Sequence, residues 1–255
     1  MGSLQCLNVG CGDASVIQSQ GATFLIDCHK IEEHSSLLPV DKIIKAVFIT
    51  HQHTDHYSGL KFLRDEAYSI SHLIYSPYER RWGDDSVTIE EWNEFNDLKE
   101  YFKTQGTNLY RPYRQTLFSE PWWSTNDIKF EIIGPHSDVA DSDTRVIHDG
   151  SLVIKAILNN RRCLFAGDAS DTNLEYIANN TNNFCNDILH ASHHGSLEGA
   201  HLEFIKKCNA EYTLISTESG VHENVPHPTA LKRYKDNTKH DVRRTDIDGS
   251  WKWEF

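Results

Sequence analysis

The sequence lacks the features that mark several classes of protein. In its 255 residues no apolar run approaches the roughly 20 residues needed to span a bilayer. The opening MGSLQCLNVG has no basic segment ahead of an apolar one, which is unlike a secretory signal. Internal repeats, low-complexity segments and clear linkers are missing as well. We therefore expect one soluble, cytoplasmic domain over residues 1–255 with no membrane association.

Cysteine pairs of the CxxC type are also absent. The six cysteines are scattered along the chain: Cys6, Cys11, Cys28, Cys163, Cys185 and Cys208. In a chain of this length such spacing is typical of reduced thiols and not of a disulfide framework. Any bound metal would therefore be held by histidine and carboxylate side chains.

Basic residues are fewer than acidic ones. There are 25 Lys and Arg against 37 Asp and Glu, which gives a formal net charge of −12. Proteins that coat duplex DNA without sequence preference usually present a broad basic face. The composition argues against a chromatin-like binder, although a phosphate-containing substrate could still be bound locally.

Short strand-like runs alternate with helical segments. The clearest helix runs from Thr88 to Lys103, where Thr88 and Glu91 form a possible capping box and apolar residues recur every three or four positions. The irregular segment around it, about 76–127, resembles an inserted helical and aromatic cover over a strand-rich scaffold. Mixed strands and helices predict an α/β layered domain. The main strand-like runs are 4–9, 14–19, 23–27, 45–49, 72–75, 128–133, 151–158, 162–166, 187–190, 212–216 and 251–255.

One stretch, FITHQHTDHYSGL, concentrates possible metal ligands directly after the expected strand 45–49. In a tight loop at the carboxyl end of that strand, alternate residues project the same way. His51 and His53 could therefore converge on one cation, while Asp55 and His56 serve a neighbouring one. Imidazole and carboxylate are ligands that zinc or manganese accepts.

This HxHxDH motif resembles the signature of the metallo-β-lactamase fold superfamily, and the resemblance covers nearly the whole chain. TFLIDC places Asp27 at a strand end, where the family has an aspartate that orients the histidine loop. CLFAGDAS places Asp168 where the family has a carboxylate that bridges two metals. ILHASHHGS places His193 and His194 where the last metal histidine stands. The resemblance implies a four-layer αββα sandwich that binds two divalent metal ions, zinc or manganese.

Finer details resemble one branch of that superfamily, the soluble domain of the competence protein ComEC. The motifs concerned are LNVGCGDASVI, DGSLVIKAI, SHHGS, the HP of VPHPTALKRY, and RTDIDGSWKW. We place the chain with ComEC-like, stand-alone metallo-hydrolases. The membrane channel of that protein is absent, so its transport role does not carry over.

The resemblance also implies which residues hold each metal. In the wider superfamily a histidine in the middle of the chain completes the first site, and His148 is the candidate here, unless it only bonds the loop. The first metal would be held by His51, His53 and His148. The second would be held by Asp55, His56 and His193, with Asp168 between the two ions. His194 would contact either a metal ligand or the substrate, although sequence alone cannot separate these neighbouring histidines.

Three residues are candidates for catalysis. Two cations lower the pKa of a shared water and supply hydroxide, and Asp55 would ligate metal while accepting a hydrogen bond from this nucleophile. His227, in PHPT, would protonate the leaving group, or else has a structural role. Asp13, in VGCGDA, would orient a ligand, or else is a simple turn residue. Further substrate contacts are expected from His194, Ser196, Arg243, Arg244 and Thr245.

Several substrate classes fit such a site. A phosphodiester in nucleic acid, most of all DNA, is favoured by the ComEC-like motifs and by a basic strip at 231–244. The alternative is a small-molecule hydrolase for a cyclic nucleotide, thioester or lactone, because a fold does not fix function. A non-catalytic regulatory module and an effector of a multi-protein defence system are the remaining hypotheses. Phosphate contacts and base stacking could come from Arg80, Arg81, Arg111, Arg114, Trp122 and Trp123, although such residues more often belong to a solvated face or a core.

Overall fold

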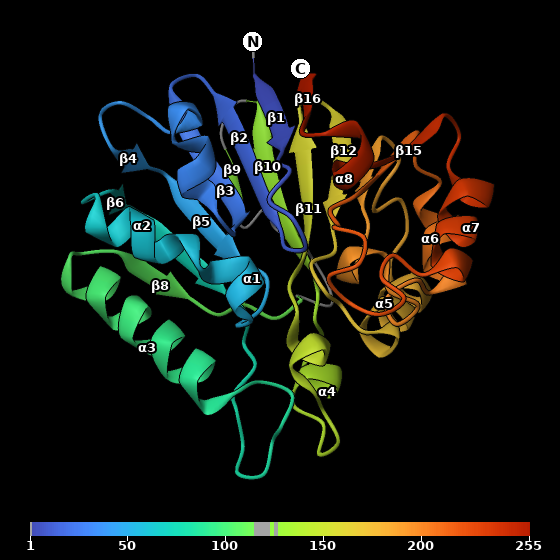
Figure 1. Cartoon of the computed structure of the whole chain (residues 1–255), viewed down its shortest axis with the longest axis horizontal. Coiled ribbons are helices and arrows are strands. Elements are labelled where there is room, and N and C mark those ends of the chain that lie inside the picture. The colour runs from blue at the N-terminus through green and yellow to red at the C-terminus, as the bar shows by residue number, and fades with distance from the viewer. Residues whose placement is uncertain (1, 115–122, 125–126) are drawn as a thin grey trace.

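Two seven-stranded sheets pack face to face at the centre of the molecule (Figure 1). The computed structural model describes all residues except 1, 115–122 and 125–126, and it describes 123–124 by backbone alone. Both chain termini lie at the upper edge of the sandwich in Figure 1. Helix α1 (Thr54–Tyr57) lies below them, towards the lower edge.

The first sheet has the order β16-β1-β2-β3-β5-β7-β8. Its strands from β3 to β8 run parallel, whereas β16, β1, β2 and β3 pair antiparallel. A separate pair, β4 (Ile43–Ile44) and β6 (Ser69–Ile70), is also parallel. The strands are β1 (Ser3–Cys6), β2 (Ala14–Ser19), β3 (Ala22–Cys28), β5 (Ala46–Ile49), β7 (His72–Tyr75), β8 (Asn108–Tyr110) and β16 (Trp251–Glu254).

The second sheet has the order β15-β14-β13-β12-β11-β10-β9. Here β9 to β12 pair antiparallel and β12 to β15 run parallel, so each sheet combines an antiparallel and a parallel half. The strands are β9 (Trp123–Ser124), β10 (Ile128–Gly134), β11 (Val153–Leu158), β12 (Arg161–Phe165), β13 (Ile188–His190), β14 (Tyr212–Ile215) and β15 (Asp241–Arg244).

Helices cover the outer faces of both sheets (Figure 1). α2 and α3 lie on the first sheet, and α5, α6 and α7 on the second. Within the described residues, no helix combines the length and apolar character that a membrane span requires. The remaining bounds are η1 (Ile31–Leu37), α2 (Gly59–Asp65), α3 (Ile89–Thr104), α4 (Ser137–Ala140), η2 (Ile147–Gly150), α5 (Asp171–Asn180), η3 (His193–Gly195), α6 (Leu202–Cys208), α7 (Pro228–Asn237) and α8 (Thr245–Asp248).

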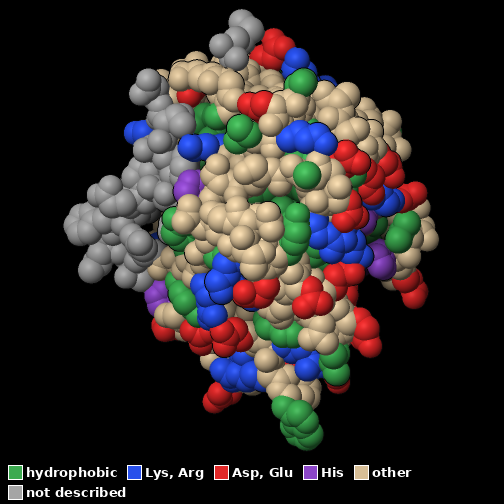
Figure 2. All heavy atoms as spheres, turned by 90° about the vertical axis from the view of Figure 1, so that its left-hand side faces the viewer, with side chains coloured by type: hydrophobic (Ala, Val, Ile, Leu, Met, Phe, Trp, Pro, Cys, Tyr) green, Lys and Arg blue, Asp and Glu red, His purple; other side chains and the backbone are tan. Residues whose placement is uncertain are grey.

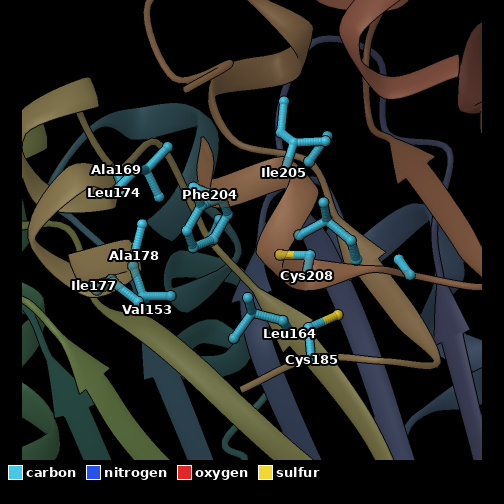
Figure 3. Close-up of a cluster of buried hydrophobic side chains, with 14 of the residues drawn as sticks. Val153, Leu164, Ala169, Leu174, Ile177, Ala178, Cys185, Phe204, Ile205 and Cys208 are labelled. Atoms are coloured by element: carbon cyan, nitrogen blue, oxygen red, sulfur yellow. The ribbon is translucent and has the colours of Figure 1, made fainter. Parts of the chain in front are cut away.

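Alternation along the strands divides the core into layers, because successive side chains of a strand point to opposite faces. In β5, Phe48 points between the sheets, where its ring centroid lies 4.8 Å from that of Phe130. Its neighbours Val47 and Ile49 pack with α2 and α3 instead. Figure 3 shows the equivalent outer layer of the second sheet, where side chains of α5 and α6 pack on β11 and β12. The α/β sandwich expected from the sequence is confirmed, with two mixed sheets flanked by helices.

The segment 76–127, expected as an inserted cover, is partly built into both sheets. It contains α3 and supplies the edge strands β8 and β9. The expected capping box of α3 is present, since Thr88 Oγ1 accepts the Glu91 N–H at 3.1 Å and the Glu91 carboxylate accepts the Thr88 backbone N–H at 3.2 Å. Phe95, Leu98 and Phe102 form its buried face.

Candidate metal centre

The candidate ligands meet at one edge of the sandwich. Parallel strands of both sheets end there, and ligands in α/β folds usually bind outside the carboxyl ends of strands. His51 follows β5, Asp168 follows β12 and His194 follows β13. His148 lies in η2, just before β11. Since β11 runs antiparallel to β12, its amino end reaches the same edge.

Two groups of ligand atoms lie side by side at this edge, each with its atoms within 4.8 Å of one another. The first group is His51, His53 and His148, and the second is Asp55, His56 and His194. Asp168 joins both, because it also groups with His51 and His56. Its Oδ1 lies 3.3 Å from His56 Nε2, and its Oδ2 lies 3.5 Å from His194 Nε2.

Asp27 braces the histidine loop from the end of β3. Its carboxylate accepts the Thr50 N–H at 2.7 Å and the Thr50 hydroxyl at 2.8 Å. It also lies 2.9 Å from His56 Nδ1, which turns Nε2 of that ring towards the cluster. Carboxylate partners of this kind fix the tautomer and orientation of metal-binding histidines.

Gly167 allows the loop that carries Asp168 to approach the histidine loop. Its φ is +50°, and a Cβ there would lie 2.6 Å from the Cβ of Thr50. A side chain at this position would therefore push apart the two loops that supply the ligands.

Several buried polar atoms of this cluster have no hydrogen-bond partner among the described residues. Buried polar atoms are nearly always paired, so their concentration at one point calls for an explanation. His51 Nε2 and His53 Nδ1 lie 3.0 Å apart, against about 3.3 Å for two nitrogen ligands of a tetrahedral zinc ion. The residues present thus fit a pair of divalent cations. The unpaired atoms are Asp13 Oδ1, His56 Nε2, His148 Nε2, Asp168 Oδ1 and His194 Nε2.

The electrostatics of the cluster favour ionised carboxylates. Burial raises the pKa of Asp168, but His194, His56 and His193 outweigh it and hold that pKa well below its usual range. Burial lowers the pKa of His148 to about 3, so this ring is a neutral lone-pair donor at pH 7. Metal binding would therefore compete with protons mainly at the histidines that face carboxylates.

The two adjacent histidines of η3 point to different partners. His194 Nε2 lies 3.2 Å from Asp55 Oδ2, while its Nδ1 lies 3.0 Å from the Ser216 carbonyl oxygen. His193 instead groups with His148 and Asp168: its ring centroid lies 4.4 Å from that of His148, and its Nε2 lies 3.8 Å from Asp168 Oδ2. The structure thus groups His194 with Asp55 and His56, in the place that the sequence analysis gave to His193. Both residues have a φ of +51°, a backbone turn that no sequence pattern announced.

A cavity of about 700 Å³ opens over the cluster. One wall is formed by ligand candidates, and another by residues 85–88 together with Glu91 of α3. His222 and Val225 contribute from the segment before α7. None of the described residues that line the cavity is a lysine or an arginine. The sequence analysis did not single out His29, which also lines it and lies two residues after Asp27, at the same strand end.

Asp13 lies beneath the cluster. Its Oδ1 is 3.6 Å from His194 Nδ1, and its backbone N–H donates to the Asp55 carbonyl oxygen at 3.0 Å. Its carboxylate is buried, and Oδ2 lies 3.7 Å from His190 Nδ1. Asp13 thus lies close to His194 without a hydrogen bond to it, and its expected role in orienting a ligand stays a prediction.

The other expected site residues do not line the cavity. His227 caps α7, with Nδ1 accepting the Thr229 N–H at 3.1 Å. The Ser196 N–H donates to the His193 carbonyl oxygen at 2.7 Å. The remaining side-chain partners are Asp241 for Arg243, Asp246 for Arg244, and the Thr217 carbonyl oxygen for Thr245.

The arginine side chains of the segment 76–127 also have partners within the protein. Arg81 and Arg111 pair with Asp143 and Glu79, and Arg80 and Arg114 donate to the carbonyl oxygens of Val87 and Asn180. Trp122 and the side chain of Trp123 lie outside the described residues.

Comparison with known proteins agrees with this geometry. The family model described as "Metallo-beta-lactamase superfamily" matches residues 41–216. The comparison with curated proteins found no match.

Solved structures share the fold at low sequence identity. The metallo-β-lactamase fold protein YhfI from Bacillus subtilis is 15% identical, with 98% of this chain and 100% of that chain covered and a TM-score of 0.57. Zn²⁺-bound PqqB from Methylobacterium extorquens is 9% identical, with coverages of 99% and 100% and a TM-score of 0.60. Tm1679, a metal-dependent hydrolase, is 13% identical, with coverages of 100% and 99% and a TM-score of 0.59.

Proposed function

Because this chain belongs to the metallo-β-lactamase superfamily and carries the His/Asp cluster of a metal-dependent hydrolase, we propose that it hydrolyses a phosphodiester. The observation that carries the proposal is the pair of ligand groups joined through Asp168 under one cavity. Two divalent ions held there would supply Lewis acidity and an activated water for in-line attack on phosphorus.

The two carboxylates at the cluster have different environments and therefore different roles. The Asp168 side chain is 3% exposed, and it lies between the two ligand groups at the base of the cavity. The Asp55 side chain is 31% exposed and lines the cavity. Asp55 Oδ2 can thus accept a hydrogen bond from an attacking water while it faces His56 and His194. The carbonyl oxygen of Ser216 accepts a hydrogen bond from His194 Nδ1 and so holds this ring in its orientation.

The cavity favours a small phosphodiester such as a cyclic nucleotide. Its volume lies within the usual range of about 300–1,000 Å³ for small-ligand sites. A long polyanion would need basic side chains along its path, and the arginines considered above are paired or donate to carbonyl oxygens. On the face shown in Figure 2, basic and acidic side chains are interspersed.

DNA is the second candidate substrate. The observation in its favour is the basic strip 231–244, which forms most of α7 and all of β15. The resemblance to the ComEC-like branch stays a prediction and points the same way. If DNA is the substrate, the positive charge of this strip would attract the DNA strand and guide it towards the cavity.

The test is a substrate panel. Bis-p-nitrophenyl phosphate, cyclic nucleotides, single-stranded DNA, duplex DNA and RNA are each incubated with zinc, manganese or magnesium. Asp55→Ala is the inactive control, and Asp143→Ala, a change to an exposed surface partner of Arg81, is the active control. We expect metal-dependent cleavage of a small phosphodiester that Asp55→Ala abolishes.

Cleavage of DNA without cleavage of any small diester would indicate that the protein is a nuclease. Activity on a thioester or lactone alone, with no phosphodiester cleaved, would overturn the proposal.

A further inference from the structure

His53 forms a hydrogen bond to a segment that is distant from the histidine loop in the sequence. Its Nε2 lies 2.7 Å from the carbonyl oxygen of Ser86. A carbonyl oxygen only accepts, so Nε2 carries the proton and Nδ1 keeps its lone pair. This Nδ1 is the atom that lies 3.0 Å from His51 Nε2 in the first ligand group. The backbone carbonyl at position 86 therefore selects the tautomer with which His53 can bind a metal, provided that this segment is held in place.

The same serine also reaches the turn that carries His148. Ser86 Oγ accepts the Ile147 N–H at 3.0 Å and donates to Asp84 Oδ1 at 2.7 Å. The same carboxylate oxygen accepts the Ser86 N–H at 2.9 Å. One residue thus connects two members of the first ligand group that come from different sheets.

Apolar packing holds the serine at this position. Val87 is buried with Tyr78 and Ile147 in a small cluster separate from the main cores, with Trp92 packed against it. The Arg80 side chain donates to the Val87 carbonyl oxygen at 3.2 Å. Buried apolar contacts on both sides of the hydrogen bonds limit how far Ser86 can move relative to η2.

We propose that Ser86, held by Asp84, is a positioning residue that sets the affinity of the first metal ion by fixing His53 and His148. The inference rests on the metal centre of the proposed function, but it holds for any substrate. The second ligand group, Asp55, His56 and His194, is braced by other residues, so its affinity should not depend on Ser86. Loss of such outer partners usually costs 10–100-fold in metal affinity.

The test measures metal binding without substrate. Wild type, Ser86→Ala and Asp84→Ala are titrated with Zn²⁺ against a competing chelator, and Co²⁺-loaded protein is followed by its visible absorption. Thr104→Ala is the matched control, since it removes one hydroxyl-to-carbonyl bond at the far end of α3. We expect the two loop variants to bind one ion 10–100-fold more weakly and the other unchanged. The control should bind both as wild type does.

Asp84→Asn keeps an acceptor oxygen at the same place and should recover most of the lost affinity. Near-ultraviolet circular dichroism checks the fold of each variant. Asp84→Ala provides the test if Ser86→Ala does not fold, because among the described residues the hydrogen bonds of the Asp84 carboxylate go to Ser86.

Wild-type affinity for both ions in folded Asp84→Ala or Ser86→Ala would overturn the proposal, as would equal weakening of both. A wild-type protein that binds no divalent ion would instead overturn the metal centre of the proposed function. The two failures are therefore distinguishable.

Discussion

The two halves of the candidate centre are built in different ways. The first sheet supplies its ligands from one loop after β5, where four candidate side chains fall within six residues and Asp27 braces them from β3. The second sheet supplies His148, Asp168 and His194 from three separate loops. The first half is a local motif, whereas the second exists only once the sheet has formed. A local sequence motif can therefore reveal only the part of a ligand set that comes from one loop.

The largest expected effect comes from Asp168, where the two halves meet. Asp168→Ala removes a carboxylate that groups with members of both ligand sets and leaves their histidines without this shared anion. We expect loss of both ions, and a fall in turnover of about 1,000-fold, because metal ions contribute several kcal/mol to such reactions. Metal content and turnover of bis-p-nitrophenyl phosphate check this. Two tightly bound ions in the folded variant would contradict it.

The next largest effect distinguishes the roles of the adjacent residues His193 and His194. His194→Ala removes the partner of Asp55, so we expect one ion per chain instead of two and at least about 100-fold less turnover. His193→Ala should keep both ions and lose less than about 10-fold, because its Nδ1 is engaged with Glu198, and the residues that its Nε2 and ring face, Asp168 and His148, also group with other histidines. Elemental analysis of both purified variants decides between them. The opposite pattern would restore His193 as the ligand.

Candidate ligands could be located from the sequence where they directly follow an apolar strand. The strand that ends before THQHTDH, and the aspartates after TFLI and CLFAG, could be located because apolar runs mark the strands and ligands follow their ends. His193 and His194 could not be separated, since their directions depend on two left-handed residues in succession. Ser86 carried no signal, because its bonds to His53 and to Ile147 join segments distant in the chain.

The positions of three other expected site residues can be explained from their local sequence. Arg243 and Arg244, expected as substrate contacts, lie in edge strand β15, whose charged sequence is typical of an exposed sheet edge. The PHPT motif marks a helix start, with proline in the first turn and His227 as the cap.

A smaller effect is expected from Asp27, which braces the histidine loop in the first half of the centre. Asp27→Asn keeps the shape of the side chain but removes the charge that faces His56 Nδ1. We expect the affinity of the second ion to fall 10–100-fold, since such carboxylate partners fix the ring for metal binding. Isothermal titration with Zn²⁺ measures it. Unchanged affinity would show that the loop keeps its geometry without this carboxylate.

The smallest effect concerns Glu91, which ties α3 to the histidine loop through the Thr54 hydroxyl at 2.9 Å. Burial raises the pKa of Glu91, but hydrogen bonds from Thr88 and Thr54 lower it overall below its usual 4.5. The ionised form therefore stabilises the fold above pH 4.5, and this stabilisation is lost as the pH falls through the lowered pKa. Glu91→Gln should reduce the free energy of unfolding by about 0.5–1 kcal/mol at pH 7 and by less at pH 3.5. Urea denaturation at both values checks it, and an equal loss at both would contradict the assignment.

The most direct test of the central claim is electron paramagnetic resonance of the Mn²⁺-loaded wild-type protein, with the metal content measured on the same sample. We expect two ions per chain with the spectrum of an exchange-coupled pair, because Asp168 groups with members of both ligand groups. A single ion per chain, or two ions that give the spectrum of isolated Mn²⁺, would contradict a shared dinuclear centre.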